Sequence, residues 1–103
     1  LIFTVSLEGF LFVIDKKSGN IIRVTDIFKQ FKIKKRSKIK PVGFIVGSQN
    51  IYLTTNNGKL IIIDISTGKA QSILKIDSGK ISRPFVLNKN LYIIKENSVI
   101  RLN

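Results

Sequence analysis

The amino-acid sequence predicts an all-β protein, a β-propeller fragment of about two and a half four-stranded antiparallel blades. The first observation behind this prediction is an internal repeat: residues 7–19 recur as residues 56–68, and residues 45–53 recur as residues 85–93. The second is a regular succession of short β-type runs and turns. Repeats of roughly 40 to 50 residues built from short strands are typical of propeller blades, because a four-stranded sheet buries both faces only when neighbours stack on it.

Ten strands are expected from runs of Val, Ile, Phe and Tyr that are bounded by Gly, Asn, Asp and Ser. In chain order they cover residues 1–6, 10–15, 21–27, 43–47, 50–55, 59–64, 70–76, 84–88, 91–95 and 98–102. The runs Phe10–Ile14 and Leu60–Ile63 are apolar at every position, so we expect both faces of these strands to be covered. The side chains expected in the interior are Leu60, Ile62, Leu91 and Ile93.

The turns between these strands carry recognisable chemistry. Asn57-Gly58 predicts a two-residue type I′ hairpin turn, which needs positive φ at both positions. Glu8-Gly9 and Asn97-Ser98 occupy the equivalent turns. In the longer loops 15–19 and 64–68, an Asp carboxylate can accept turn N–H groups and a Gly can take the left-handed conformation. A structural turn role is therefore expected for Asp15, Gly19, Gly58, Asp64 and Gly68.

In propeller order, residues 1–28 supply the last three strands of one blade and residues 29–41 form a basic inter-blade connection. Residues 42–76 form a complete blade, and residues 77–103 supply the first three strands of a final blade. A propeller needs at least four blades, roughly 160 residues, so we expect the remaining blades of the same propeller outside this 103-residue chain.

The basic connection 29–41, called the basic arm below, interrupts the repeat. Seven of the twelve residues from 29 to 40 are Lys or Arg, in a chain of net charge +12. One interpretation is a solvated connection whose charge reflects composition, since like charges repel and extend a segment. The other is a docking arm for an acidic protein surface or for lipid phosphate, with Phe28, Phe31 and Ile33 either pinning the arm or forming its apolar contact. The candidate partner-binding residues are Lys29, Lys32, Lys34, Lys35 and Arg36.

The residue types needed for most catalytic chemistry are scarce. The chain has no His, no Cys and only six acidic residues. We find no metal-ligand spacing, no nucleophile with a partner base and no glycine-rich phosphate loop. We therefore expect no enzyme activity, no cofactor and no metal, and the sparse aromatics among the basic loops argue against specific nucleic-acid binding.

Two resemblances bear on function. The segment 58–69, Gly-Lys-Leu-Ile-Ile-Ile-Asp-Ile-Ser-Thr-Gly-Lys, resembles the repeat of propellers of the pyrroloquinoline-quinone (PQQ) type, although this chain lacks the Trp that ends their repeat. Segments 77–86 and 90–103 are similar to the C-terminal end of the BamB family, the propeller lipoproteins of the bacterial outer-membrane β-barrel assembly machinery. A long connection comparable to that family's follows Thr25-Asp26-Ile27-Phe28.

The BamB resemblance implies a non-catalytic protein-interaction scaffold. The resemblance also implies a periplasmic, outer-membrane associated location and binding to the barrel-inserting subunit of the machinery. Attachment to the membrane would occur only through an upstream lipid anchor. Two alternatives remain: part of a PQQ-dependent dehydrogenase-like propeller, or a binder of anionic partners through the basic arm.

Overall fold

A computed structural model describes residues 1–103 as an all-β protein. Its ten strands form three antiparallel sheets, with strand orders β1-β2-β3, β4-β5-β6-β7 and β10-β9-β8. This succession of three, four and three strands is consistent with a propeller fragment and confirms the predicted fold class. The strands are Ile2–Val5 (β1), Phe10–Ile14 (β2), Ile21–Asp26 (β3), Pro41–Val46 (β4), Asn50–Thr55 (β5), Lys59–Asp64 (β6), Ala70–Lys75 (β7), Phe85–Leu87 (β8), Asn90–Lys95 (β9) and Ser98–Arg101 (β10).

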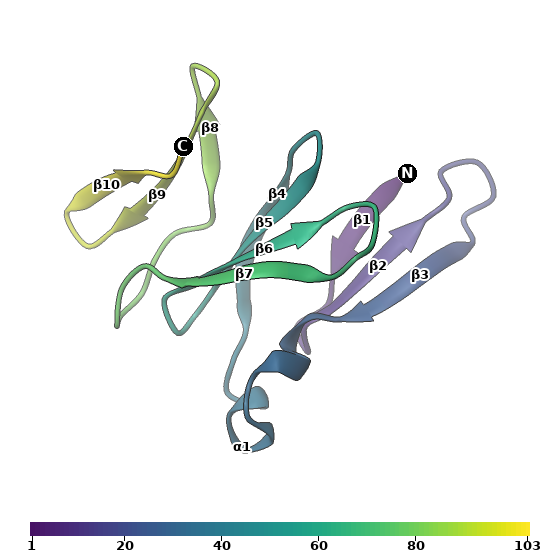
Figure 1. Ribbon diagram of the computed structural model, residues 1–103, viewed down its shortest axis with the longest axis horizontal. Coiled ribbons are helices and arrows are strands. Elements are labelled where there is room, and N and C mark those ends of the chain that lie inside the picture. Colours follow the sequence, from purple (N-terminus) through teal and green to yellow (C-terminus); the bar gives the residue numbers. More distant parts are fainter. The chain divides into compact units, whose positions relative to one another are not determined.

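The chain divides into two compact units, Leu1–Pro41 and Val42–Asn103. The first unit contains β1 to β3, followed by a 3₁₀ helix, Ile27–Gln30 (η1), and a single α-helical turn, Ile33–Arg36 (α1). The second unit contains the other two sheets, which Figure 1 shows in teal to yellow. No helix is long and apolar enough to cross a membrane.

The sheet of the first unit and the four-stranded sheet of the second share a backbone irregularity. The pairing of β2 with β3 shifts register between Val13 and Ile14, and the pairing of β6 with β7 shifts between Ile62 and Ile63. These two sites are 49 residues apart, the same separation as Gly9 and Gly58. The sequence repeat is therefore also a repeat of local structure, since such bulges bend a strand at one defined point.

The second unit is held together by a stack of its two sheets. Leu60 from β6, Ile93 from β9 and Ile81 from the β7–β8 connection form one buried cluster. Side chains packed around this cluster are Tyr52, Ile62, Ile76 and Leu102. Of the four side chains predicted to be interior, Leu60, Leu91 and Ile93 are buried. Ile62 is only half-buried, because it lies at the margin of the cluster.

The expectation that both faces of two apolar runs are covered is wrong for β2, where Leu11 and Val13 are buried but Phe10, on the other face, is exposed. The apolar run of β6 is covered on both faces, as expected for an inner strand. Ile61 and Ile63 are fully buried on the face opposite Leu60, together with Ile51 and Leu53 of β5. The terminal sheet differs, because only one of its faces contributes to the stack. Its other face carries a stacked Phe85–Tyr92 pair with ring centroids 5.7 Å apart, and exposed Leu87, Ile94 and Val99.

The predicted type I′ turn at Asn57-Gly58 is wrong. The β5–β6 connection has three residues, and among them only Gly58 has positive φ, at 76°. Its N–H donates to the Thr55 carbonyl at 3.2 Å, so a four-residue turn, 55–58, ends at a left-handed glycine. This is the three-residue hairpin loop, in which only the last position requires glycine.

The β8–β9 connection is the two-residue loop in which both residues have positive φ. Asn88 and Lys89 have φ of 51° and 66°. Positive φ at both central positions matches the right-handed twist of paired strands, which is why such turns favour Asn and Gly. Lys89 takes this conformation without being a glycine, at a cost of about 1–2 kcal/mol that the surrounding hairpin must offset.

Gly58 also allows a close backbone approach. The Gly58 carbonyl accepts the N–H of Ile76 at 2.9 Å, and a Cβ built on Gly58 would collide with the Asp77 carbonyl oxygen. In the first unit, the Gly9 carbonyl accepts from Ile27 at 2.9 Å in the same way. Each hairpin glycine therefore contacts the chain at the point where it leaves the last strand of the same sheet, β3 beside Gly9 and β7 beside Gly58.

We predict that Gly58→Ala destabilises the second unit by more than about 2 kcal/mol, because a positive-φ penalty adds to a backbone collision. The matched control is Gly79→Ala in the same unit. Gly79 has no positive φ, and an added Cβ would meet only the Asp77 carboxylate at an ordinary 3.4 Å. Urea unfolding of both variants measures the difference, and equal stabilities would contradict the geometry of the Gly58 loop.

Candidate functional site

The basic arm is an ordered segment of two short helical turns, where the sequence indicated no helix. Asp26 begins η1 by accepting the Phe28 N–H on its carboxylate at 3.2 Å. The Phe31 N–H then donates to the Phe28 carbonyl at 3.0 Å and closes that turn. A capping Asp before a helical turn satisfies an N–H that has no partner within the helix. The β3 strand therefore ends at Asp26, one residue before the predicted limit.

Apolar side chains are buried at both limits of the arm. Ile27 and Phe28, which directly precede it, are buried, with the Phe28 ring against Gly9 of the β1–β2 turn, and Ile39 is buried near its end. The Phe31 ring packs edge-on against Phe28, with centroids 5.8 Å apart and planes at 67°. Phe28 and Phe31 thus pin the arm, one of the two roles that the sequence left open for them.

Arg36 differs from the other four candidate residues because its side chain folds back onto the arm. Its Nε donates to the Phe31 carbonyl at 2.9 Å, and its Nη2 donates to the Lys29 carbonyl at 2.5 Å. The guanidinium thereby satisfies two carbonyl groups of the connection with one planar group. The remaining candidates, Lys29, Lys32, Lys34 and Lys35, are exposed.

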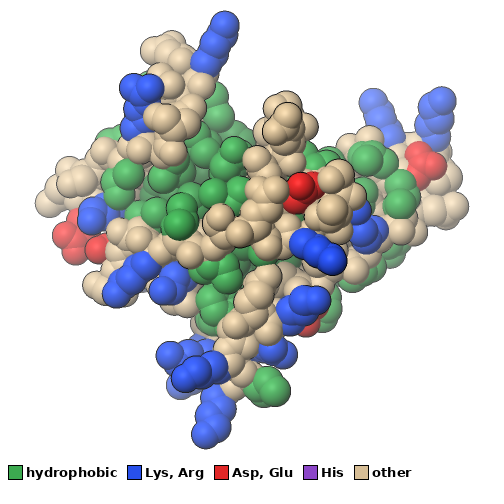
Figure 2. Space-filling view, in the orientation of Figure 1, with side chains coloured by type: hydrophobic (Ala, Val, Ile, Leu, Met, Phe, Trp, Pro, Cys, Tyr) green, Lys and Arg blue, Asp and Glu red, His purple; other side chains and the backbone are tan.

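Ile33 lies at the first position of α1 with 77% of its surface exposed, the largest fraction among the large hydrophobic side chains. It does not pin the arm. Figure 2 shows Lys and Arg side chains clustered at the lower end of the view, over α1, with a hydrophobic side chain among them. In the sequence, Ile33 stands out because it lies between Lys32 and Lys34. This pattern alone does not predict whether the Ile33 side chain is buried or exposed.

A second candidate site, which the sequence did not reveal, is a cleft in the second unit. The β4–β5 and β8–β9 turns lie at the same end of the two stacked sheets (Figure 1), and a cleft of about 250 Å³ lies between these hairpins. In Figure 2 a hydrophobic area lies between the two protruding hairpin tips in the upper part of the view. The residues that line this cleft include Ser48, Tyr52, Val86, Lys89, Leu91 and Leu102.

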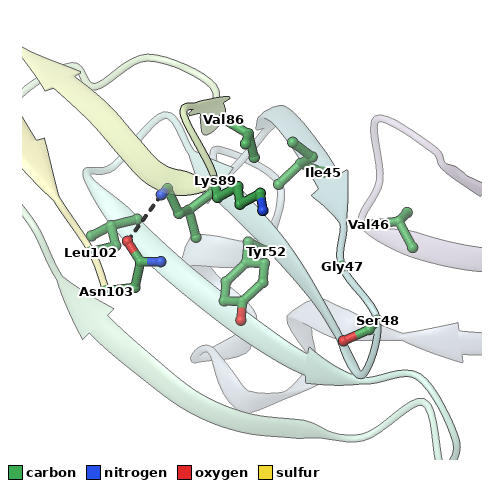
Figure 3. Close-up of a pocket in the computed structure, with 10 residues that line it drawn as sticks. Ile45, Val46, Gly47, Ser48, Tyr52, Val86, Lys89, Leu102 and Asn103 are labelled. Carbon is green, nitrogen blue, oxygen red and sulfur yellow. Dashed lines mark hydrogen bonds between the residues drawn. The ribbon is translucent and has the colours of Figure 1, made fainter.

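The cleft combines an apolar wall with a polar rim. Val86, Leu91 and Leu102 supply aliphatic surface, and Figure 3 shows Tyr52 and Lys89 directed toward the space between the hairpins. Asn103 supports the wall, because its Oδ1 accepts the Leu91 N–H at 3.0 Å. No acidic residue lines the cleft, and Lys89 is its charged group. An apolar side chain carrying or flanked by a carboxylate fits this chemistry.

The two turn aspartates bind their own loops. The Asp64 carboxylate accepts the Ser66 hydroxyl at 2.5 Å, the Ser66 N–H at 2.7 Å and the Gln71 side chain at 3.1 Å. Asp15 accepts the Lys17 N–H at 3.0 Å. The hydrogen bond from the Ser66 side chain is the main cause that lowers the pKa of Asp64, and the bond from the Lys17 backbone has the same effect on the pKa of Asp15.

Neither aspartate belongs to a group of three or more His, Cys, Asp or Glu residues that could hold a metal ion, and the described residues contain no such group. The glycines of these loops, Gly19 and Gly68, both have φ of 75°. Their N–H groups donate back to the carbonyls of Asp15 and Asp64, each at 2.8 Å. The local contacts of both loops are therefore those of closed turns.

No known protein family's model matches this chain, and no curated protein matches its sequence. Function is therefore inferred from the basic arm, from the cleft and from the repeat pattern.

We predict that Arg36→Gln loosens the arm. Losing both guanidinium hydrogen bonds should raise the hydrogen-exchange rates of the η1 and α1 amides by at least about tenfold, because a single hydrogen bond to a charged group already contributes about 1.5–3 kcal/mol. Lys35→Gln is the matched control, since it removes a neighbouring exposed charge. Equal exchange rates in the two variants would show that the fold-back of Arg36 does not hold the arm.

A further prediction concerns acid stability. The pKa of Asp64 lies below its ordinary value of 3.8 in the folded protein, so its carboxylate stabilises the fold above that value, and this contribution is lost as pH falls through the lowered pKa. Asp64→Asn should therefore be less stable than the parent protein at neutral pH, with a difference that shrinks below pH 3.8. Unfolding measured across this range tests the prediction. Glu8→Gln, an exposed carboxylate in another turn, is the control, and a constant difference for Asp64→Asn would contradict it.

Proposed function

We propose that this chain is part of a β-propeller that serves as a non-catalytic protein-interaction scaffold, resembling the propellers of the BamB family. The repeat of Gly9, Asp15 and Gly19 at Gly58, Asp64 and Gly68 supports this proposal, as does the succession of three-, four- and three-stranded sheets. The stacked sheets of the second unit pack face to face as successive blades do.

The observation that carries the scaffold proposal is the cleft between the β4–β5 and β8–β9 hairpins. Propellers present loops at the ends of their blades, and loops positioned by a rigid sheet are common binding elements. Here the apolar wall offers a place for an anchoring side chain of a partner protein, and Lys89 adds a cation at the rim. Such anchors in pockets carry much of the affinity of protein interfaces.

The partner that the resemblance suggests is the barrel-inserting subunit of the outer-membrane assembly machinery. With that partner, the protein would act in the periplasm at the outer membrane, beside the remaining blades of its own propeller. A cleft without acidic side chains suits a loop of this partner that carries an apolar residue next to Asp or Glu.

A second candidate function, binding of an anionic partner through the basic arm, is favoured by the exposure of Lys29, Lys32, Lys34 and Lys35. The conformation of the arm is fixed by Arg36 and by buried Ile27 and Phe28. Its four lysines are therefore displayed together on one ordered segment.

The test of the scaffold proposal fills the cleft. Ser48→Trp places a large ring at the rim of the cleft, and Ser78→Trp adds the same ring at an exposed position of the β7–β8 connection, outside the cleft lining. Binding to the purified barrel-inserting subunit should weaken about tenfold or more for Ser48→Trp, the loss typical of a blocked anchor pocket. Ser78→Trp should bind normally.

Unchanged affinity for Ser48→Trp would remove the cleft as the docking site, and absence of binding by the parent protein would remove this subunit as the partner. Circular dichroism of both variants separates these outcomes from loss of folding.

A further inference from the structure

The tip of the basic arm presents one aliphatic side chain within a group of cations. Ile33 is 77% exposed, and Lys32, Lys34, Lys35 and Lys38 are exposed around it in sequence. An exposed Ile of this kind is not itself unusual on a protein surface. Its surroundings are unusual, because no Asp or Glu occurs anywhere from residue 27 to residue 63. The arm therefore has no carboxylate of its own that could neutralise its lysines.

The arm does not need to fold when it binds. Ile27, Phe28 and Ile39 bury its two ends, and Arg36 ties its middle to the carbonyls of Lys29 and Phe31. The backbone of the tip is thereby ordered before any partner arrives. Pre-ordering lowers the entropic cost of binding, so even a small contact area can give measurable affinity.

The chemistry of the tip distinguishes between two anionic partners. A protein that captures a helix in a groove reads several apolar anchors spaced at three and four residues, whereas α1 is four residues long and offers Ile33 alone. A bilayer surface requires cations at the level of the phosphates and an apolar group just below them. The arm supplies both, and it supplies the charge mainly through lysine, which acts as a point charge without directional pairing.

We propose that the basic arm binds an anionic lipid surface, with Ile33 inserted beneath the phosphates and Lys32, Lys34 and Lys35 contacting them. This inference rests on the second candidate function, binding of an anionic partner through the basic arm, and names the partner; it does not depend on the cleft or on the scaffold proposal. The contact is a peripheral one, in which each lysine contributes about a fivefold gain in partition onto an anionic bilayer.

The test measures partition of the whole protein onto phosphatidylcholine vesicles with and without phosphatidylglycerol. The parent protein should bind only the anionic vesicles and should be released by salt. Ile33→Ser should reduce partition about tenfold and keep the salt dependence, because only the inserted group is lost. The double variant Lys34→Glu, Lys35→Glu should reduce partition by more than tenfold and flatten the salt dependence.

A matched control carries the same charge change elsewhere. Lys16→Glu, Lys17→Glu reverses two adjacent exposed lysines in the β2–β3 loop and should leave partition close to that of the parent. Equal losses in the two double variants would show that net charge alone drives binding and would overturn the proposal. An unchanged Ile33→Ser variant would overturn it as well, as would binding to an acidic protein without binding to vesicles.

Insertion of the tip can be observed directly, because the chain contains no Trp. Ile33→Trp introduces a single indole, whose emission should shift to shorter wavelength on anionic vesicles and should be quenched by lipids brominated on the acyl chain. Asn20→Trp, at an exposed position of the β2–β3 loop, should show neither change. An unshifted Ile33→Trp emission on vesicles that bind the protein would contradict insertion.

Discussion

The position of the basic arm and the stacking of the second unit's sheets depend on one backbone contact, which joins each hairpin glycine to the residue that follows the last strand of the same sheet. The carbonyls of Gly9 and Gly58 accept N–H groups from Ile27 and Ile76, and neither glycine has room for a side chain. This contact fixes the point at which a strand becomes a connection. In the first repeat that connection is the basic arm, and in the second it carries Ile81 into the sheet stack. One backbone geometry therefore determines where the arm begins and how the two sheets of the second unit pack.

The strands were predictable because their signal is local. Runs such as Leu60–Ile63 are short, rich in β-branched Ile and bounded by turn residues, and these three local properties favour a buried strand over a helix. The type of each turn was less predictable. Asn57-Gly58 suits a two-residue loop, but the glycine is used as the last position of a three-residue loop. The two-residue turn is instead formed by Asn88 and Lys89. Lysine rarely adopts positive φ, but the pairing of β8 with β9 imposes this conformation on Lys89.

The candidate sites divide in the same way. The charge of the arm is visible in the sequence, and four of its five selected cations are exposed. The side chain of Arg36 binds carbonyls of the arm, whereas the side chain of Ile33 points to solvent. Both orientations depend on how η1 and α1 are placed by the buried residues beside them, and the residue types alone do not predict them. The cleft was not predictable at all, because its walls come from residues 45–52 and 86–103, which only the stacking of two sheets brings together.

The uncovered face of the β8–β10 sheet has a consequence for biosynthesis. The ribosome delivers β4–β7 before β8–β10, so the terminal sheet can stack on a finished neighbour as soon as it is made. Its other face, with Phe85, Tyr92, Leu87, Ile94 and Val99, gains nothing from that step. Apolar sheet faces of this kind are what chaperones bind and what drives aggregation. Until a neighbouring sheet or another protein covers this face, a newly made chain is therefore open to chaperone capture and to aggregation.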